Sequence, residues 1–279
     1  MPHFGYTSLG FGSGTTAADT GFNIDIQEVE ATILLRTGDA VGVIAYGTDT
    51  NELYVFDGSN WQIYNNFTNN LSCEFDASND VLPLASPKSF AGAFSLSIWF
   101  KQTTDALGIL AYGTTGGAYV ELKKSPTQGK LIVSGWGSIV SGTGAFTFGQ
   151  WSHFMFVRDS SDGTEAWVNG SSIGTATKSG TVNVSQFGTY STATEPFGGF
   201  LDEIAMWESD QSSNVSTIYN SGLPANLKGL SPLNWWRMGD TNPASAGTAV
   251  SSVTDVQGVT NLTQGTATKQ PVLSLDVAT

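Results

Sequence analysis

The sequence has little of several features that would point to a function. Its 279 residues include one cysteine, Cys73, so no disulfide bond can form within the chain. Charged residues make up 13% of the chain, about half the ~25% of an average soluble domain. Only 11 residues are basic against 24 acidic ones, which gives a net charge of −13. Proteins that follow nucleic-acid phosphates need a basic stripe, so no nucleic-acid partner is expected.

Long apolar runs are absent as well. No stretch approaches the ~20 apolar residues of a membrane-spanning helix, so no membrane insertion is predicted. The first residues, Met1–Tyr6, lack the basic and apolar segments of a secretory signal. We therefore expect a soluble protein that is not exported by the usual route.

Short apolar runs separated by small turn residues fill the sequence from residue 70 to the C-terminus. In the clearest run Phe94, Leu96, Ile98 and Phe100 alternate with Ser95, Ser97, Trp99 and Lys101, which is typical of a strand buried on one face. Further strands are predicted over residues 109–112, 118–122, 130–134, 151–159 and 165–170, the last ending in an Asn-Gly hairpin turn. One helix is expected over residues 213–221, with Gly222 as its C-cap. Many short strands and one helix predict an antiparallel β-sandwich over residues 70–279.

Two smaller segments precede this predicted sandwich. Residues 1–28 form an extended arm rich in Gly, Ser and Thr, with aromatic rings at Phe4, Tyr6, Phe11 and Phe22. The arm is either a disordered terminus or a segment that docks on a neighbouring subunit. Residues 29–68 are expected to form a small three-stranded β-meander, with strands near 41–46, 53–56 and 61–64. A meander of this size needs something to pack against.

Four motifs fall in the order that laminin-G-like domains show. They are Phe75-Asp76 with Asn79-Asp80, the run Ser95–Phe100, the pair Trp151–Phe154 and Trp167–Gly170, and Leu201–Trp207. From residue 70 onward the chain therefore resembles the laminin-G-like, concanavalin-A-like jelly rolls. The resemblance implies an all-β antiparallel sandwich that binds a ligand far more often than it catalyses a reaction.

Two further resemblances concern the ends of the chain. Residues 235–240 and 255–258 look like a variant common in virion proteins of marine phages, in which final strands return beside the opening ones. Residues 29–68 are similar to hairpin modules that recur in structural proteins of tailed bacteriophages. The implied protein is a non-enzymatic virion component, a capsid decoration or a tail-fibre part made in the host cytoplasm. Its N-terminal third would contact other virion proteins, and the aromatic arm predicts a homo-oligomer, a trimer.

Adjacent carboxylates, Asp202 and Glu203, stand near the start of the strand-like run 199–207. Glycosidases need two carboxylates about 5 to 9.5 Å apart, whereas consecutive strand residues project from opposite faces, so no catalytic pair and no enzymatic activity are expected. In a structural role, one carboxylate caps backbone amides and the other faces solvent. The alternative is Ca²⁺, which takes about 6 to 8 oxygen ligands. The candidate ligands are Asp76, Asp80 and Asp202, because the resemblance places the opening and closing strands side by side.

Other catalytic groups are sparse. His153 lies inside a strand-like run, where the resemblance makes it a packing residue, and Cys73 is expected to be a small core residue. No cysteine or histidine spacing indicates zinc.

Aromatic side chains are the remaining candidates. Most of the 8 tryptophans alternate along strands and are expected in the core. Tyr112, Trp136 and Tyr190 are expected to be exposed in loops, where their rings could stack on host-surface glycans. The alternatives to a virion protein are a free lectin-like carbohydrate-binding module and, less favoured, a glycoside hydrolase.

Overall fold

The structure is a computed structural model that divides the chain into two compact units, Met1–Phe67 and Thr68–Thr279. It describes residues 26–48, 52–56, 58–63, 69–104, 107–114, 117–125, 128–190, 195–241 and 244–278. The aromatic residues of the predicted arm lie outside the described residues. Among the described residues, no helix is long and apolar enough to cross a membrane.

The first unit is a four-stranded sheet in the order β1-β2-β3-β4 with one short helix. Its elements are β1 (Ile26–Glu28), α1 (Glu30–Leu35), β2 (Ile44–Gly47), β3 (Glu52–Phe56) and β4 (Trp61–Ile63). The predicted three-stranded meander is present as β2, β3 and β4. The assignment of Ile26–Glu28 to the extended arm is wrong, because these residues form a fourth strand that pairs in parallel with β2. The apolar run at residues 33–35 is the end of α1, whose Ile33 is fully buried with Tyr54 and Trp61. The sheet thus gains the apolar cover that a meander alone lacks.

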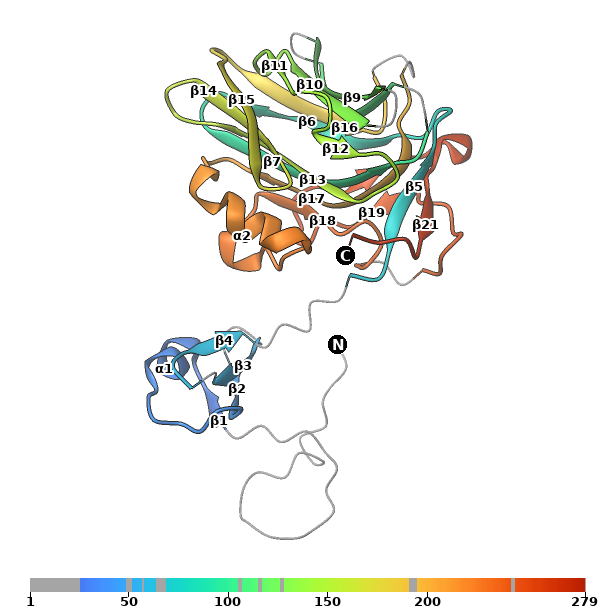
Figure 1. The fold of residues 1–279 in the computed structure, drawn as a ribbon. Helices are drawn as coiled ribbons and strands as arrows, with labels where there is room; N and C mark the ends of the chain where they lie inside the picture. The colour runs from blue at the N-terminus through green and yellow to red at the C-terminus, as the bar shows by residue number, and fades with distance from the viewer. Residues whose placement is uncertain are drawn as a thin grey trace. The chain divides into compact units, whose positions relative to one another are not determined.

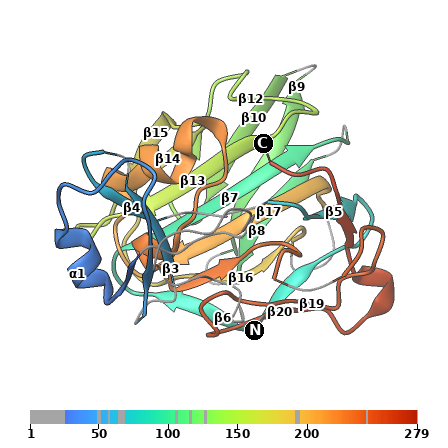
Figure 2. The same ribbon diagram turned by 90° about the horizontal axis from the view of Figure 1, so that it is seen from below.

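The second unit is a sandwich of two antiparallel sheets, which Figure 1 shows as stacked layers. The sheet named here after β7 has the order β15-β14-β13-β7-β17-β5-β21, with β18 paired to β17. Its strands are β5 (Ser72–Asp76), β7 (Phe94–Gln102), β13 (Ser152–Arg158), β14 (Gly163–Val168), β15 (Ser171–Thr177), β17 (Gly198–Trp207), β18 (Asn234–Trp236) and β21 (Val272–Ser274). Figure 2 shows β13, β7 and β17 side by side.

The other sheet, named here after β9, has the order β11-β10-β9-β8-β16-β6-β20-β19, with β12 paired to β10. Its strands are β6 (Leu82–Phe90), β8 (Gly108–Gly113), β9 (Ala118–Ser125), β10 (Gln128–Ser134), β11 (Ile139–Val140), β12 (Phe146–Thr147), β16 (Val182–Phe187), β19 (Ser252–Val253) and β20 (Leu262–Thr263). The predicted all-β, concanavalin-A-like architecture is confirmed.

The core lies between the two sheets and follows the alternation in the sequence. Side chains at residues 94, 96, 98 and 100 all belong to it, as predicted. The opposite face of β7 is also buried at Ser95, Ser97 and Trp99. It is covered by the segment after β17, which carries α2 (Val215–Tyr219) and short 3₁₀ turns at Ser212–Asn214, Asn220–Gly222 and Lys228–Leu230. This cover sits on the outer face of the β7 sheet, the face turned away from the core (Figure 1).

The predicted helix is shorter than expected. Its C-cap is Asn220, with φ of 47°, and not Gly222. Asparagine tolerates this left-handed conformation, so the helix ends there before the glycine is reached. The Asn169-Gly170 turn between β14 and β15 is confirmed, since φ is positive at both residues, 51° and 74°.

The closing strands return beside the opening ones, as the resemblance implied. β21 pairs with β5, so that Leu273 lies opposite Cys73. Cys73 is buried in the core.

Candidate functional site

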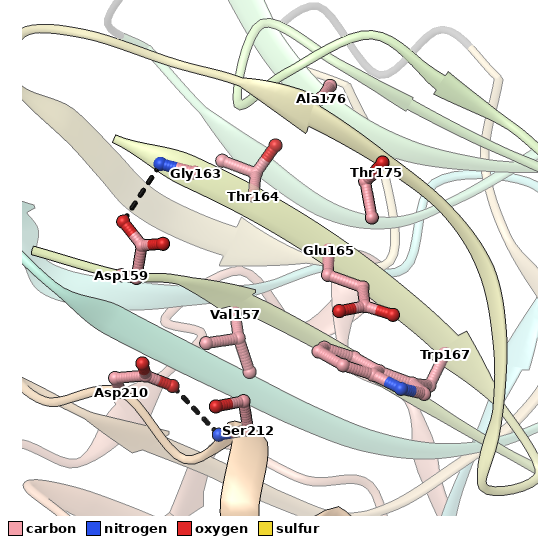
Figure 3. A pocket seen from close by; sticks show the side chains of 10 residues that line it. All are labelled: Val157, Asp159, Gly163, Thr164, Glu165, Trp167, Thr175, Ala176, Asp210 and Ser212. Carbon is pink, nitrogen blue, oxygen red and sulfur yellow. Dashed lines mark hydrogen bonds between the residues drawn. The ribbon is translucent and has the colours of Figure 1, made fainter. Parts of the chain in front are cut away.

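A groove of about 220 Å³ crosses the outer face of the β7 sheet over β13, β14 and β15 (Figure 3). The central row of lining residues consists of Val157, Glu165 and Thr175, which are cross-strand partners in the strand register. Side chains of a strand alternate between faces, and Ala166 lies in the core, so Glu165 and Trp167 project outward. The lining residues are Val157, Asp159, Gly163, Thr164, Glu165, Trp167, Thr175, Ala176, Asp210 and Ser212.

Two carboxylates at the rim of this groove are held by backbone N–H groups. One oxygen of Asp159 accepts hydrogen bonds from Ser161 N at 2.7 Å and Gly163 N at 2.9 Å. One oxygen of Asp210 accepts from Ser212 N at 2.8 Å. Each carboxylate has a second oxygen that makes no hydrogen bond among the described residues. The rim therefore offers two oriented hydrogen-bond acceptors.

Gly163 leaves room for the Asp159 carboxylate at one end of the groove. A Cβ atom at Gly163 would lie 2.5 Å from the free oxygen of Asp159. Any side chain there would displace the carboxylate and fill that end of the groove.

The carboxylate of Glu165 has no hydrogen-bond or ion-pair partner in the described part of the chain. Figure 3 shows it directed toward the indole of Trp167, two residues further along β14. Trp167 keeps 8% of its surface exposed and lines the groove. An aromatic ring beside an unpaired carboxylate can bind a polar ligand that also has an apolar or cationic face.

Of the three aromatic residues predicted to bind glycans, the structure brings together Tyr112 and Tyr190 but not Trp136, which lies in the core. The rings of Tyr112 and Tyr190 are in contact, with centroids 4.6 Å apart, and Tyr119 adds a third ring 5.8 Å from Tyr190. Tyr112 is 6% exposed and Trp136 is fully buried, so the prediction that these two are exposed is wrong. The Trp136 indole packs edge-on against Phe94 and donates its N–H to the Asn183 carbonyl at 3.1 Å.

The glycines flanking Trp136 do not mark an exposed loop. A Cβ atom at Gly135 would lie 2.5 Å from the Cα atom of Ala118. The glycine therefore permits a close approach of two backbones, which directs the following tryptophan into the core.

The proposed calcium ligands do not converge in the structure. Asp76 and Asp80 share a turn, in which Asp76 N donates to the Asp80 carboxylate at 2.9 Å, and burial raises the pKa of Asp80 to about 6. Asp202 is four residues along β17 from Gly198, the partner of Asp76, a separation of roughly 13 Å at strand rise. Among the described residues, no group of three or more His, Cys, Asp or Glu side chains is placed to hold a metal ion. Calcium binding stays a prediction.

Asp202 and Glu203 occupy a β-bulge. The register between β17 and β7 shifts between Asp202 and Ala205, and Glu203 has φ of 43°. Leu201 and Ile204 both enter the core, so both carboxylates lie on the outer face. The prediction that they project from opposite faces is therefore wrong, because the bulge adds one residue to the alternation.

This carboxylate pair is buried and fully engaged. Asp202 accepts hydrogen bonds from Asn69 Nδ2 at 2.7 Å and from the Glu203 and Ala278 backbone N–H groups. Glu203 accepts from Trp235 Nε1 at 2.6 Å and Arg237 Nε at 2.9 Å. Burial raises the pKa of Glu203 to about 7 and that of Asp202 well above its usual range, the latter with help from the Glu203 charge. At 0% and 2% exposure, neither carboxyl is open to a substrate.

A serine–histidine pair that the sequence did not reveal lies under α2. The Ser97 hydroxyl is 2.8 Å from His153 Nε2. The imidazole packs between Trp99 and Tyr219, and burial lowers its pKa to about 3. His153 is fully buried, so its predicted packing role is confirmed and its access to a substrate is blocked.

Sequence reasoning missed the groove residues. The spacing of Glu165 and Trp167 in the run before the Asn-Gly turn was a usable signal, because it places both on one face of a strand. Asp210 carried no such signal, since it reaches the groove only through the packing of the segment after β17.

The comparisons agree with this architecture. Residues 76–214 match a family model for laminin G domains, described as the concanavalin A-like lectin/glucanases superfamily. A putative carbohydrate binding protein from Bacteroides ovatus is similar at 14% identity, with 85% of this chain and 70% of that chain covered and a TM-score of 0.55. A heptameric SAP-like pentraxin from Limulus polyphemus is similar at 16% identity, with 54% of this chain and 82% of that chain covered and a TM-score of 0.46. No curated protein matches the chain. At 14% identity, the likeness to the Bacteroides ovatus structure shows the fold alone.

Proposed function

Starting from a laminin-G-like, concanavalin-A-like sandwich, we propose that this chain is a non-enzymatic carbohydrate-binding module whose sugar site is the groove over β13, β14 and β15. The observation that carries the proposal is the placement of Glu165 and Trp167. Where the Trp167 indole lines the groove it offers an apolar contact to a sugar, and carboxylates accept hydrogen bonds from sugar hydroxyls. The similar Bacteroides ovatus structure, described as a putative carbohydrate binding protein, supports the same class of ligand.

The rest of the groove suits a small polyhydroxylated ligand. Small sites combine apolar lining with a few oriented polar groups, and here Val157 and Trp167 are joined by Asp159 and Asp210. Binding is favoured over hydrolysis because the adjacent carboxylates Asp202 and Glu203 are buried.

The proposal is tested by binding of the full chain to a glycan array, followed by calorimetry with the best ligands. Glu165→Gln is expected to lower affinity at least tenfold, because an amide accepts fewer and weaker hydrogen bonds than a carboxylate. Glu74→Gln, at an exposed position of β5, is the matched control. Binding that is unchanged in Glu165→Gln would place the sugar elsewhere.

A narrower proposal is that the protein is a structural component of a tailed phage particle, attached through its N-terminal third and assembled as a trimer. It is supported by the resemblances of residues 29–68, 235–240 and 255–258 to phage proteins. Exposed apolar side chains in the first unit also favour a partner there, at Val29, Leu34, Leu35 and Val41. Purified phage particles are expected to contain peptides of this chain, and their absence would contradict the structural role. A monomeric mass in light scattering would contradict the trimer.

Calcium is proposed only for the turn that contains Asp76 and Asp80. Millimolar Ca²⁺ is then expected to raise the melting temperature of the protein, since a ligand that binds only the folded state stabilises it. The shift should disappear in Asp80→Asn. An equal shift with Mg²⁺, or none with Ca²⁺, would end the proposal.

A further inference from the structure

The charge of the groove has one sign. Of its ten lining residues, Asp159, Glu165 and Asp210 are acidic and none is basic. A cleft concentrates the field of the charges that line it, so this groove attracts cations and repels anions. The net charge of −13 on the whole chain adds to that preference.

Glu165 is the acidic group that most lacks a counter-charge. It stands partly buried between Val157 and Thr175, with no hydrogen-bond donor from the described residues. A carboxylate in such surroundings has lost part of its hydration without gaining a partner. A cationic ligand group would restore the lost interaction, whereas a hydroxyl would restore only part of it.

Trp167 favours the same kind of group. A cation within about 6 Å of an indole ring is attracted to the face of that ring. Because the Glu165 carboxylate is directed toward this indole (Figure 3), an ammonium group bound to the carboxylate would also lie near the ring.

The two rim carboxylates indicate which kind of cationic ligand fits the groove. Asp159 and Asp210 each present a free oxygen at a different part of the groove. The aliphatic stem of a lysine side chain has no donor for them, whereas a sugar ring has hydroxyl donors around its whole edge.

We propose that the groove binds an amino sugar with a free ammonium group, which pairs with Glu165 beside Trp167 while ring hydroxyls donate to Asp159 and Asp210. This inference rests on the proposed carbohydrate-binding function and names the class of sugar. N-acetylated and acidic sugars bind less tightly, because the first lack the charge and the second carry the wrong sign.

The test is NMR or calorimetric titration of the full chain with glucosamine, N-acetylglucosamine, glucose and glucuronic acid, at a pH that keeps the amine protonated. Glucosamine is expected to bind at least tenfold more tightly than the other three. Glu165→Gln should abolish this preference, and Glu74→Gln should keep it. Unchanged melting temperatures would show that both variants are folded.

Three outcomes would overturn the inference, and they differ in meaning. Equal affinity for glucosamine, N-acetylglucosamine and glucose, lost in Glu165→Gln, would leave a sugar site without the amine preference. N-acetyl-lysine methylamide bound as tightly as glucosamine would indicate a peptide cation instead. No binding of any of these sugars, with a negative glycan array, would remove the carbohydrate-binding function together with the inference.

Discussion

The carboxylate of Asp202 accepts a hydrogen bond of 2.9 Å from the backbone N–H of Glu203, the residue that follows it. This contact stabilises a bulge in the middle of β17 and turns both acidic side chains toward the outer face of the sheet. Asp202 then holds Asn69, where the chain enters the sandwich, and Ala278, near its end. The adjacent carboxylates, which were candidates for a catalytic pair, thus connect three parts of the second unit that are far apart in the sequence.

Removing the Glu203 carboxylate should be strongly destabilising. In Glu203→Ala, Arg237 and the Trp235 indole N–H lose a buried partner, so we expect the free energy of unfolding to fall by about 3–5 kcal/mol. Urea denaturation measures the loss. Glu74→Ala, at an exposed position, should stay within about 0.5 kcal/mol of the wild type. A loss below about 1 kcal/mol in Glu203→Ala would contradict the buried network.

The burial of His153 predicts a specific acid sensitivity. Its pKa falls from the usual 6.5 to about 3, so the unfolded chain binds a proton between these values while the folded chain does not. Stability from this residue is fully present above pH 6.5 and is lost as pH falls toward 3, by a total of about 5 kcal/mol. Denaturation curves of the wild type and His153→Gln, compared at each pH, isolate this contribution from that of the carboxyls. Parallel pH profiles would contradict it.

Gly135 should tolerate no side chain. A Cβ atom there meets the Ala118 backbone at 2.5 Å, and φ is 73°, so Gly135→Ala is expected to lower the free energy of unfolding by about 1–3 kcal/mol. The same change should loosen Trp136 and shift its fluorescence to longer wavelength. Gly142→Ala is the control, because nothing lies within 4 Å of its Cβ position. Similar melting temperatures for the two variants would count against the close approach.

Tyr190 distinguishes the two candidate sugar sites. If the groove is the site, Tyr190→Ala should leave sugar affinity within twofold of the wild type, because the tyrosine cluster with Tyr112 and Tyr119 is not among the groove's lining residues. Calorimetry of Tyr190→Ala and Glu165→Gln, compared side by side, shows which of the two sites binds the sugar. Loss of binding in the tyrosine variant alone would favour the site expected from the sequence.

The groove should also respond to salt. Pairing between an ammonium group and a partly exposed carboxylate is screened by ions, so glucosamine affinity should fall several-fold between 50 mM and 500 mM NaCl. Affinity for glucose, measured in the same titrations, should change little. An identical salt response for the two sugars would contradict an ionic contact.

Much of the fold could be predicted from local pattern. The alternation over residues 94–101 is a property of neighbours in the sequence, and it identified the side of β7 that faces the core. The Asn169-Gly170 turn was recognised because both residues accept positive φ. The wrong predictions concern sequence patterns that can have either of two physical causes. Glycines beside Trp136 suggested a loop, yet they serve a close approach of backbones, and the strict alternation assumed at Asp202 fails once a bulge adds a residue.

The sequence by itself therefore determined that this is an antiparallel sandwich, which side of β7 faces the core, and that Glu165 and Trp167 share a face of their strand. Only the tertiary structure decided what lies on that face: the segment after β17 covers Ser97 and His153 but leaves Glu165 in an open groove that Asp210 also lines. The physical reason is the separation in sequence of the residues that determine each property. Periodicity along a strand fixes the direction of each side chain through backbone geometry alone, whereas its neighbours are set by contacts between segments far apart in the chain.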